Sequence, residues 1–234
     1  MKLGINQPYL FPYLGYFQLL AAVDKFVVYD DVSFIKQGWI NRNHILVGGK
    51  AHLFSVPLKD ASSFKCIFEI QVNQEGYAAW LRKFLTTIHQ SYRKAPFYEP
   101  VRRLLERVFE GNPGSIAGLA LASMRETVRY LDIRTAIVET SRNYGNALLK
   151  GQHRVIDICL KEGADRYINA IGGKDLYAVA DFLAHGITLQ FLQSRPASYR
   201  QFAETFVPGL SIIDVMMFNS PAAAGRLLRE FDLQ

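Results

Sequence analysis

Residues 1–31 contain the pattern that most constrains the fold, because they read as strand, loop, helix and strand in immediate succession. The apolar run Leu3–Ile5 predicts a strand, and Pro8 and Pro12 then make a stiff, non-helical connector by fixing φ and removing backbone donors. Apolar residues at helical spacing follow over 14–21, and Phe26–Tyr29 predicts a second buried strand. A βαβ unit of this kind places its two strands in parallel in one sheet.

Polar side chains follow both strands of this unit at the points where the strands end. Asn6 and Gln7 follow the first strand, and Asp30 and Asp31 follow the second. Ligands of open parallel sheets bind in the crevice beyond the carboxyl ends of the strands. We therefore expect the two amides and the two carboxylates to line one crevice, with an aspartate as the base and Gln7 as a positioning group.

Three tyrosines of the connector and the first helical turns, Tyr9, Tyr13 and Tyr16, are candidate substrate contacts. Packing in the core is the more common role of any single aromatic residue at such spacings, and that alternative stays open. Asn6 and Gln7 are harder to explain by packing, because buried amides need hydrogen-bond partners.

The chain beyond residue 135 repeats the alternation of strands and helices. Its predicted elements are strands at 135–141, 167–170 and 188–192 and helices at 155–162 and 176–185. Gly172-Gly173-Lys174 follows the second of these strands, where a glycine pair lets the backbone approach a ligand and free N–H groups suit an anion. A tight turn without a ligand is the alternative.

The middle of the chain predicts an insertion between these two halves. Gly48 and Gly49 separate two β-rich runs, which is typical of a hairpin, and residues 76–131 predict helices with a turn at 111–114. The alternation on either side predicts a single α/β domain over 1–234. We expect a three-layer, Rossmann-like fold with a mostly parallel sheet, a β-hairpin and a helical insertion.

Two further places carry candidate binding residues. Trp39, Asn41, Arg42 and Asn43 lie in a polar stretch that could be a recognition loop, with a solvated connector as the alternative. Asp214 lies in an otherwise apolar helix, where a carboxylate needs a partner. A cap or an ion pair with an arginine competes there with a position in the crevice.

Charge and composition exclude several classes of function. The net charge of +6 favours an anionic small-molecule ligand. The lysines and arginines form no dense basic stripe, so we expect no nucleic-acid partner, and nucleic-acid binding stays open as a third class that only the basic pI supports. No apolar run is long enough to span a membrane, and no signal peptide precedes the first strand. Cys66 and Cys159 lack metal-ligand spacing. We therefore expect a cytoplasmic protein without a metal site. The sequence does not indicate a cofactor, and a homo-oligomer is possible.

Several stretches together resemble the WbqC-like protein family. They are Asn6–Tyr9, Pro12–Phe17, Asp30–Val32, Trp39–Asn43, Arg154–Ile158, Gly163–Tyr167, Gly172–Lys174 and Phe206–Asp214. This bacterial family is associated with gene clusters for O-antigen, other surface polysaccharides and secondary metabolites. The resemblance implies a transferase of such a pathway, which would bind an anionic activated donor, nucleotide-linked or acyl or aminoacyl, in the crevice.

One departure from the family pattern concerns the first strand end. The family usually has histidine before Gln-Pro, and this chain has Asn6. Asparagine keeps the capacity for hydrogen bonding but cannot exchange a proton near neutral pH. The alternative function is therefore a non-catalytic ligand-binding or assembly protein of the same pathway.

Overall fold

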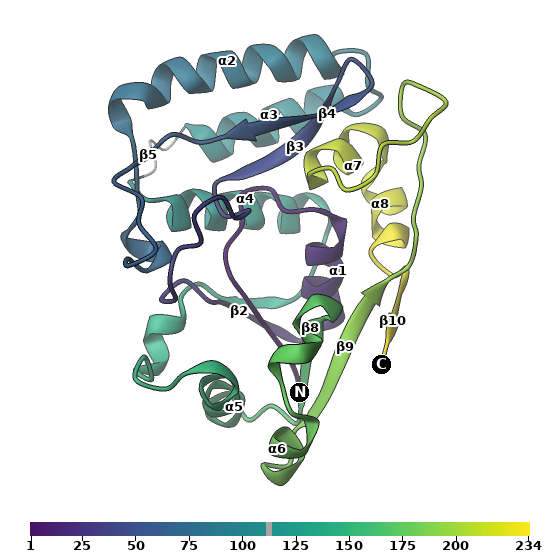
Figure 1. The fold of residues 1–234 in the computed structure, drawn as a ribbon. Coiled ribbons are helices and arrows are strands. Elements are labelled where there is room, and N and C mark those ends of the chain that lie inside the picture. The colour runs from purple at the N-terminus through teal and green to yellow at the C-terminus, as the bar shows by residue number, and fades with distance from the viewer. Residues whose placement is uncertain (111–113) are drawn as a thin grey trace.

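A computed structural model describes residues 1–110 and 114–234, with a six-stranded sheet in one half of the molecule (Figure 1). Its strands are β1 (Lys2–Asn6), β2 (Lys25–Val28), β7 (Ala136–Val138), β8 (Arg166–Ala170), β9 (Thr188–Ser194) and β10 (Phe231–Leu233). They are ordered β10–β9–β8–β1–β2–β7, with β10 antiparallel and the other five parallel. The chain thus has the mixed α/β fold and the mostly parallel sheet that its alternating pattern predicts.

Helices cover both faces of this sheet, because the strand side chains alternate between two cores. The helices concerned are α1 (Leu14–Ala22), α5 (Gly151–Glu162) and α6 (Val179–Ala184). Phe26 and Val28 of β2 pack with α1, whereas Val27 between them packs with α5 and α6 on the other face. The predicted βαβ unit is present, since β1 and β2 are parallel and Asn6 pairs with Val28.

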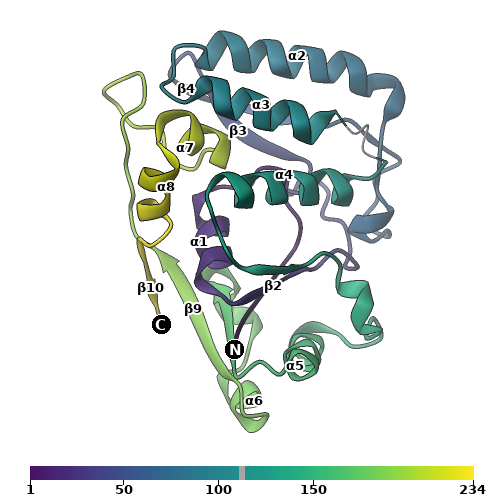
Figure 2. The ribbon, with the colours of Figure 1, turned by 180° about the vertical axis from the view of Figure 1, so that it is seen from behind.

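The chain between β2 and β7 forms an inserted part beside the sheet. Its elements are β3 (Arg42–Val47), β4 (Lys50–Ser55), β5 (Leu58–Lys59), η1 (Ile67–Glu69), β6 (Gln71–Val72), α2 (Gln74–Tyr92), α3 (Tyr98–Phe109) and α4 (Ile116–Tyr130). Both glycines of the predicted hairpin turn, Gly48 and Gly49, have positive φ, which a tight turn between β3 and β4 requires. Both views place α2 farthest from the sheet and α4 closest to it (Figures 1 and 2). Of the predicted turn at 111–114, residues 111–113 lie outside the described residues.

The C-terminal part differs most from the expectation. One helix was expected around Asp214, and the structure has α7 (Ile212–Phe218), α8 (Pro221–Leu227) and then β10, which pairs with β9 at the sheet edge. A strand as short as β10 carries no recognisable periodicity, which is why the pattern did not indicate it. No helix within the described ranges is both long enough and apolar enough to cross a membrane.

Candidate functional site

The neighbouring strands β1 and β8 send their connections to opposite faces of the sheet. β1 leads to α1 on one face, whereas β8 leads through the 3-10 helix η3 (Ile171–Leu176) to α6 on the other. Gly4 pairs with Ile168, so Asn6 ends level with Ala170. In open sheets with such a reversal of direction, ligands bind beyond the carboxyl ends of the two strands. We call residues 6–7 and 169–174 the switch point.

The first strand end brings two amides to the switch point. The Asn6 side-chain oxygen accepts a hydrogen bond from the Gln7 N–H at 2.8 Å, and the Gln7 carbonyl accepts one from the Tyr16 hydroxyl at 2.9 Å. The side-chain oxygen Oε1 of Gln7 is buried and has no hydrogen-bond donor among the described residues. An acceptor buried in this way costs about 1–3 kcal/mol, so it can gain from a donor supplied by a ligand.

The second strand end brings a third amide and a cation. Asn169 is buried, and its side-chain oxygen accepts from the Ala170 N–H at 2.9 Å. Its Nδ2 lies so close to Gly173 that a Cβ built on that glycine would be 2.3 Å away. Lys174 is exposed and forms no ion pair with any residue that the structure describes. The predicted Gly172-Gly173-Lys174 loop therefore follows the strand that is paired with β1, and its ammonium group has no acidic partner among the described residues.

The close approach at Gly173 can be tested against its neighbour. Gly173→Ala should force the Asn169 amide to move, lower the free energy of unfolding by about 1–2 kcal/mol and weaken ligand binding. Gly172→Ala is the matched control, because a Cβ there would meet nothing within 4 Å. Urea unfolding of both variants measures the difference, and equal stabilities would show that the glycine pair is only a turn.

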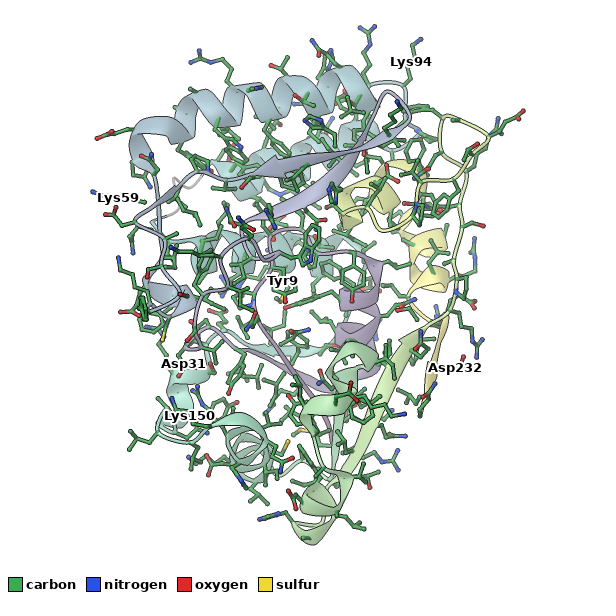
Figure 3. All side chains as sticks on the ribbon, viewed as in Figure 1. Tyr9, Asp31, Lys59, Lys94, Lys150 and Asp232 are labelled. Atoms are coloured by element: carbon green, nitrogen blue, oxygen red, sulfur yellow. The ribbon has the colours of Figure 1, made fainter. Side chains whose placement is uncertain are left out.

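The three tyrosines differ in how far a ligand could reach them. Tyr16 is buried and packs against Tyr9, with ring centroids 5.8 Å apart, so its ring belongs to the core. Tyr13 is 46% exposed, and Tyr9 is partly buried near the centre of the molecule (Figure 3). Burial raises the pKa of Tyr9 and so does nearby Tyr13, which keeps the Tyr9 hydroxyl protonated as a hydrogen-bond donor. Tyr9 and Tyr13 remain the candidates for ligand contact.

Asp30 lies at the end of β2, but its contacts are with the segment after β7. Its Oδ1 accepts from the Thr140 hydroxyl at 2.8 Å and from the Ser141 N–H at 3.2 Å. The Arg142 guanidinium lies 3.6 Å from the other carboxylate oxygen and stacks over the Phe68 ring. Asp30, Phe68 and Arg142 line a cavity of about 230 Å³. A ligand in that cavity could therefore reach this carboxylate.

Asp31 forms a buried ion pair with Arg154 of α5, and both side chains are more than nine-tenths buried. The carboxylate also accepts from the Ser141 hydroxyl, while Arg154 donates to Asn146 at 2.9 Å and lies 4.9 Å from the centre of the Tyr29 ring. Sequence reasoning missed the role of Arg154. The signal in the sequence that could have indicated a buried ion pair was the position of Arg154 within the apolar stripe of α5.

The stretch around Arg42 belongs to the inserted part. The Arg42 Nε donates to the Gly38 carbonyl at 2.9 Å, its guanidinium lies 5.7 Å from the Trp39 ring, and Asn41 donates to the Val56 carbonyl at 3.0 Å. Asn41 and Arg42 line a cavity of about 400 Å³ that shares no residue with the cavity at Asp30. The single crevice expected from the sequence therefore needs correction. The chain leaves the sheet after β2, and Arg42 already begins strand β3 of the hairpin.

Asn43 holds the connector that follows the switch point. It is buried, and its amide donates to the Phe11 carbonyl at 2.7 Å, which also accepts from the Ser211 hydroxyl at 2.7 Å. Phe11 has φ of 43°, a conformation that costs a non-glycine residue about 1–3 kcal/mol, and its N–H donates to the Ser123 hydroxyl. Contacts from three distant segments therefore maintain this strained connector, and they give Asn43 a structural role.

Asp214 is fully buried and has no arginine partner within the described ranges. Its carboxylate accepts from the hydroxyls of Tyr92 at 2.8 Å and Tyr199 at 2.6 Å and from the Gln201 amide at 2.8 Å. These bonds join α7 to α2 and to the segment before α7. The complete burial of Asp214 argues against contact with a ligand in the crevice.

This buried carboxylate predicts a pH dependence of stability. Burial raises the pKa of Asp214 above its ordinary value of 3.8, although hydrogen bonds from Tyr199, Gln201 and Tyr92 act in the opposite direction. The folded state then binds the proton more tightly than the unfolded state, so stability falls as pH rises from about 3.8 through the raised pKa. The free energy of unfolding of wild type minus that of Asp214→Asn should decrease over this range in urea titrations. A difference that is constant or grows with pH would contradict this assignment.

The cysteines and acidic residues show no metal-binding arrangement. Within the described ranges, no group of three or more histidine, cysteine, aspartate or glutamate side chains is placed to hold a metal ion. Cys159 is buried, and burial raises the pKa of its thiol to about 12, so it is a core residue and not a nucleophile at neutral pH.

Comparison with known proteins identifies the family. The family model of the WbqC-like proteins matches residues 7–225, so the chain belongs to the WbqC-like protein family. The chain is also 25% identical over 232 residues to "Uncharacterized protein Rv1507c" of Mycobacterium tuberculosis (strain ATCC 25618 / H37Rv), with 97% of each chain covered. The comparison with solved structures found no match. The resemblance read from the sequence is confirmed at the level of the family.

Proposed function

We propose that this protein is a cytoplasmic transferase of a bacterial surface-polysaccharide or secondary-metabolite pathway, with its donor site at the switch point. The proposal includes a three-layer, Rossmann-like arrangement. It is supported by the order β7–β2–β1–β8–β9, in which the chain moves outward from β1 in one direction and then resumes on its other side at β8. Folds of this type bind nucleotide-containing ligands beside the first strand.

The observation that carries the proposal is the unpaired side-chain oxygen of Gln7. Most buried polar atoms of native proteins are hydrogen-bonded, so an exception at a strand end of the sheet invites a ligand donor. Gln7 stands directly after β1, and β8 beside it leads into Gly173 and Lys174. Unlike Asp214, Gln7 as a whole is only partly buried, so a rotation of its side chain can present this oxygen to a hydroxyl or amide of a ligand.

The charge of the switch point fits an anionic donor. Lys174 is exposed and has no acidic partner within the described ranges, and the chain as a whole carries +6. Nucleotide sugars and acyl-CoA thioesters share a diphosphate, which a lysine and backbone N–H groups can bind together. Stabilisation of charge by Lys174 and orientation by Gln7 would then supply most of the catalysis. Asp30 remains the candidate base, because it lines a cavity, whereas Asp31 is paired with Arg154.

A specific observation favours the alternative, a ligand-binding or assembly protein of the same pathway. The oxygen of the Asn6 side chain already accepts a hydrogen bond from the Gln7 N–H, and the resemblance described above implies that asparagine stands here in place of the family's usual histidine. Asparagine offers hydrogen bonding but no proton transfer near neutral pH. This alternative retains the same site and the same ligand class without turnover.

A thermal-shift screen tests both versions of the proposal. Nucleoside diphosphate sugars, acyl-CoA thioesters and pyrophosphate should be compared with neutral sugars and with RNA. A true ligand at about 100 times its Kd stabilises the folded state by about 2.7 kcal/mol, which raises Tm by roughly 5–10 °C in a chain of this size. A diphosphate compound should give this shift. If only neutral sugars or RNA shift Tm, the proposed donor class is wrong. Slow hydrolysis of the bound donor would separate a transferase from a binding protein.

A further inference from the structure

The inserted part contains a second cavity, between strand β4 and helix α2. Its volume is about 190 Å³, and its lining includes Phe54 of β4 and Trp80, Lys83, Phe84 and Thr87 of α2. None of these residues belongs to the switch point or to the cavity at Asp30. Figure 1 shows why the two regions are separate, since α2 and the β3–β4 hairpin lie at the opposite end of the molecule from β8 and α6.

Aromatic rings form the wall of this cavity. The rings of Trp80 and Phe84 are stacked with centroids 5.3 Å apart and an interplanar angle of 7°, and the Phe54 ring lies 4.8 Å from the Phe84 ring. Trp80 also packs on Phe109 of α3, which fixes the ring from behind. Offset and edge contacts with such rings favour an aromatic ligand beyond the effect of buried area alone.

The polar groups of the same cavity are cationic or neutral. The cavity is lined by Lys83 and by His52, and no acidic side chain is among its lining residues. The Lys83 ammonium makes no ion pair or hydrogen bond with any residue that the structure describes, although it stands beside an apolar wall. Lys83 is exposed, so water solvates its ammonium in the free protein, and an anionic group of a ligand held against the aromatic wall would take the place of that water.

We propose that this cavity binds a small aromatic carboxylate, with its ring against Trp80 and its carboxylate at Lys83. The size agrees, because an apolar cavity of about 150 Å³ in another protein accommodates benzene. A single ring with one carboxylate therefore fills the space, whereas a nucleotide does not fit. This proposal is independent of the proposed transferase function, because it uses other residues and another class of ligand.

Trp80 itself provides the measurement. The chain has two tryptophans, so Trp39→Phe leaves Trp80 as the single fluorescent indole beside the cavity. Benzoate and benzamide have nearly the same shape but differ in charge, and each is titrated into this parent protein near neutral pH. Benzoate should change the emission saturably, with a Kd of about 1 mM or tighter, as expected for a ligand with so few atoms. Benzamide should bind roughly tenfold more weakly, because it forms no charge-assisted hydrogen bond with Lys83.

Three variants in the same background locate the site. Lys83→Gln should remove the preference for benzoate, whereas Arg82→Gln, which changes the same charge at an exposed neighbour outside the cavity lining, should keep it. Thr87→Phe should fill the cavity and abolish the binding of both compounds. The proposal is overturned if benzoate gives no saturable change, if benzamide binds as tightly as benzoate to the parent, or if Lys83→Gln retains the preference. It is also overturned if folded Thr87→Phe binds benzoate like the parent.

Discussion

Replacement of Arg154 by methionine should lower the free energy of unfolding by about 3–5 kcal/mol, the largest loss that we expect from a single change. Arg154 is 4% exposed and Asp31 is 8% exposed, so among the described residues the substitution leaves a buried carboxylate with the Ser141 hydroxyl as its one side-chain partner. The variant also loses the hydrogen bond to Asn146 and the contact with the Tyr29 ring. Urea unfolding followed by circular dichroism measures the loss.

Two comparisons separate the buried ion pair from a general effect of losing an arginine. Arg142→Met removes a guanidinium that is 53% exposed and 3.6 Å from the Asp30 carboxylate, and it should cost about 1 kcal/mol or less. Adding Asp31→Asn to Arg154→Met should recover part of the lost stability, because it removes the uncompensated charge. The buried pair would lose its assigned role if Arg154→Met were as stable as Arg142→Met, or if the double variant were less stable than Arg154→Met.

The local elements of the fold could be predicted because each has a short-range cause. Pro8 and Pro12 exclude a helix before Leu14, and Gly48 and Gly49 supply the positive φ that the hairpin turn requires. The strand β10 could not be predicted in this way. The strand β10 forms because it pairs with β9, which is distant in the sequence, so no local pattern indicates it.

The same division applies to the candidate site. The ends of β1 and β8 could be predicted, because the order of strands and helices along the chain indicates where each parallel strand stops. That Gln7 and Lys174 share one site stays a prediction. The partners of Asp31 and Asp214 could not be predicted. Arg154 and Tyr92 approach these carboxylates from segments more than a hundred residues away, and no local pattern encodes such a contact.

The binding of an anionic donor should depend strongly on Gln7 and Lys174. Lys174→Gln removes the ammonium group of the switch point, and Gln7→Leu replaces the unpaired amide oxygen with a shorter, apolar side chain. Each change should weaken binding about tenfold, because each removes a hydrogen bond to a charged or buried group. Together they should weaken it roughly a hundredfold if they act independently.

Lys94→Gln is the matched control for the charge. It changes the net charge of the protein by the same amount as Lys174→Gln. Lys94 is exposed, and Figure 3 shows it at the edge of the molecule, whereas Tyr9 of the connector lies near the centre. Charges separated by more than about 10 Å of salt solution are largely screened at physiological ionic strength, so this variant should bind the donor within about twofold of wild type.

Isothermal titration calorimetry tests the switch point most directly. The ligand is the diphosphate donor that gives the largest thermal shift. It is titrated into five proteins, which are wild type, Gln7→Leu, Lys174→Gln, their double variant and Lys94→Gln. We predict wild-type affinity for Lys94→Gln, about tenfold weaker binding for each single variant at the switch point, and the weakest binding for the double variant. Equal affinity in all five proteins, with every variant folded, would show that the donor does not bind between β1 and β8.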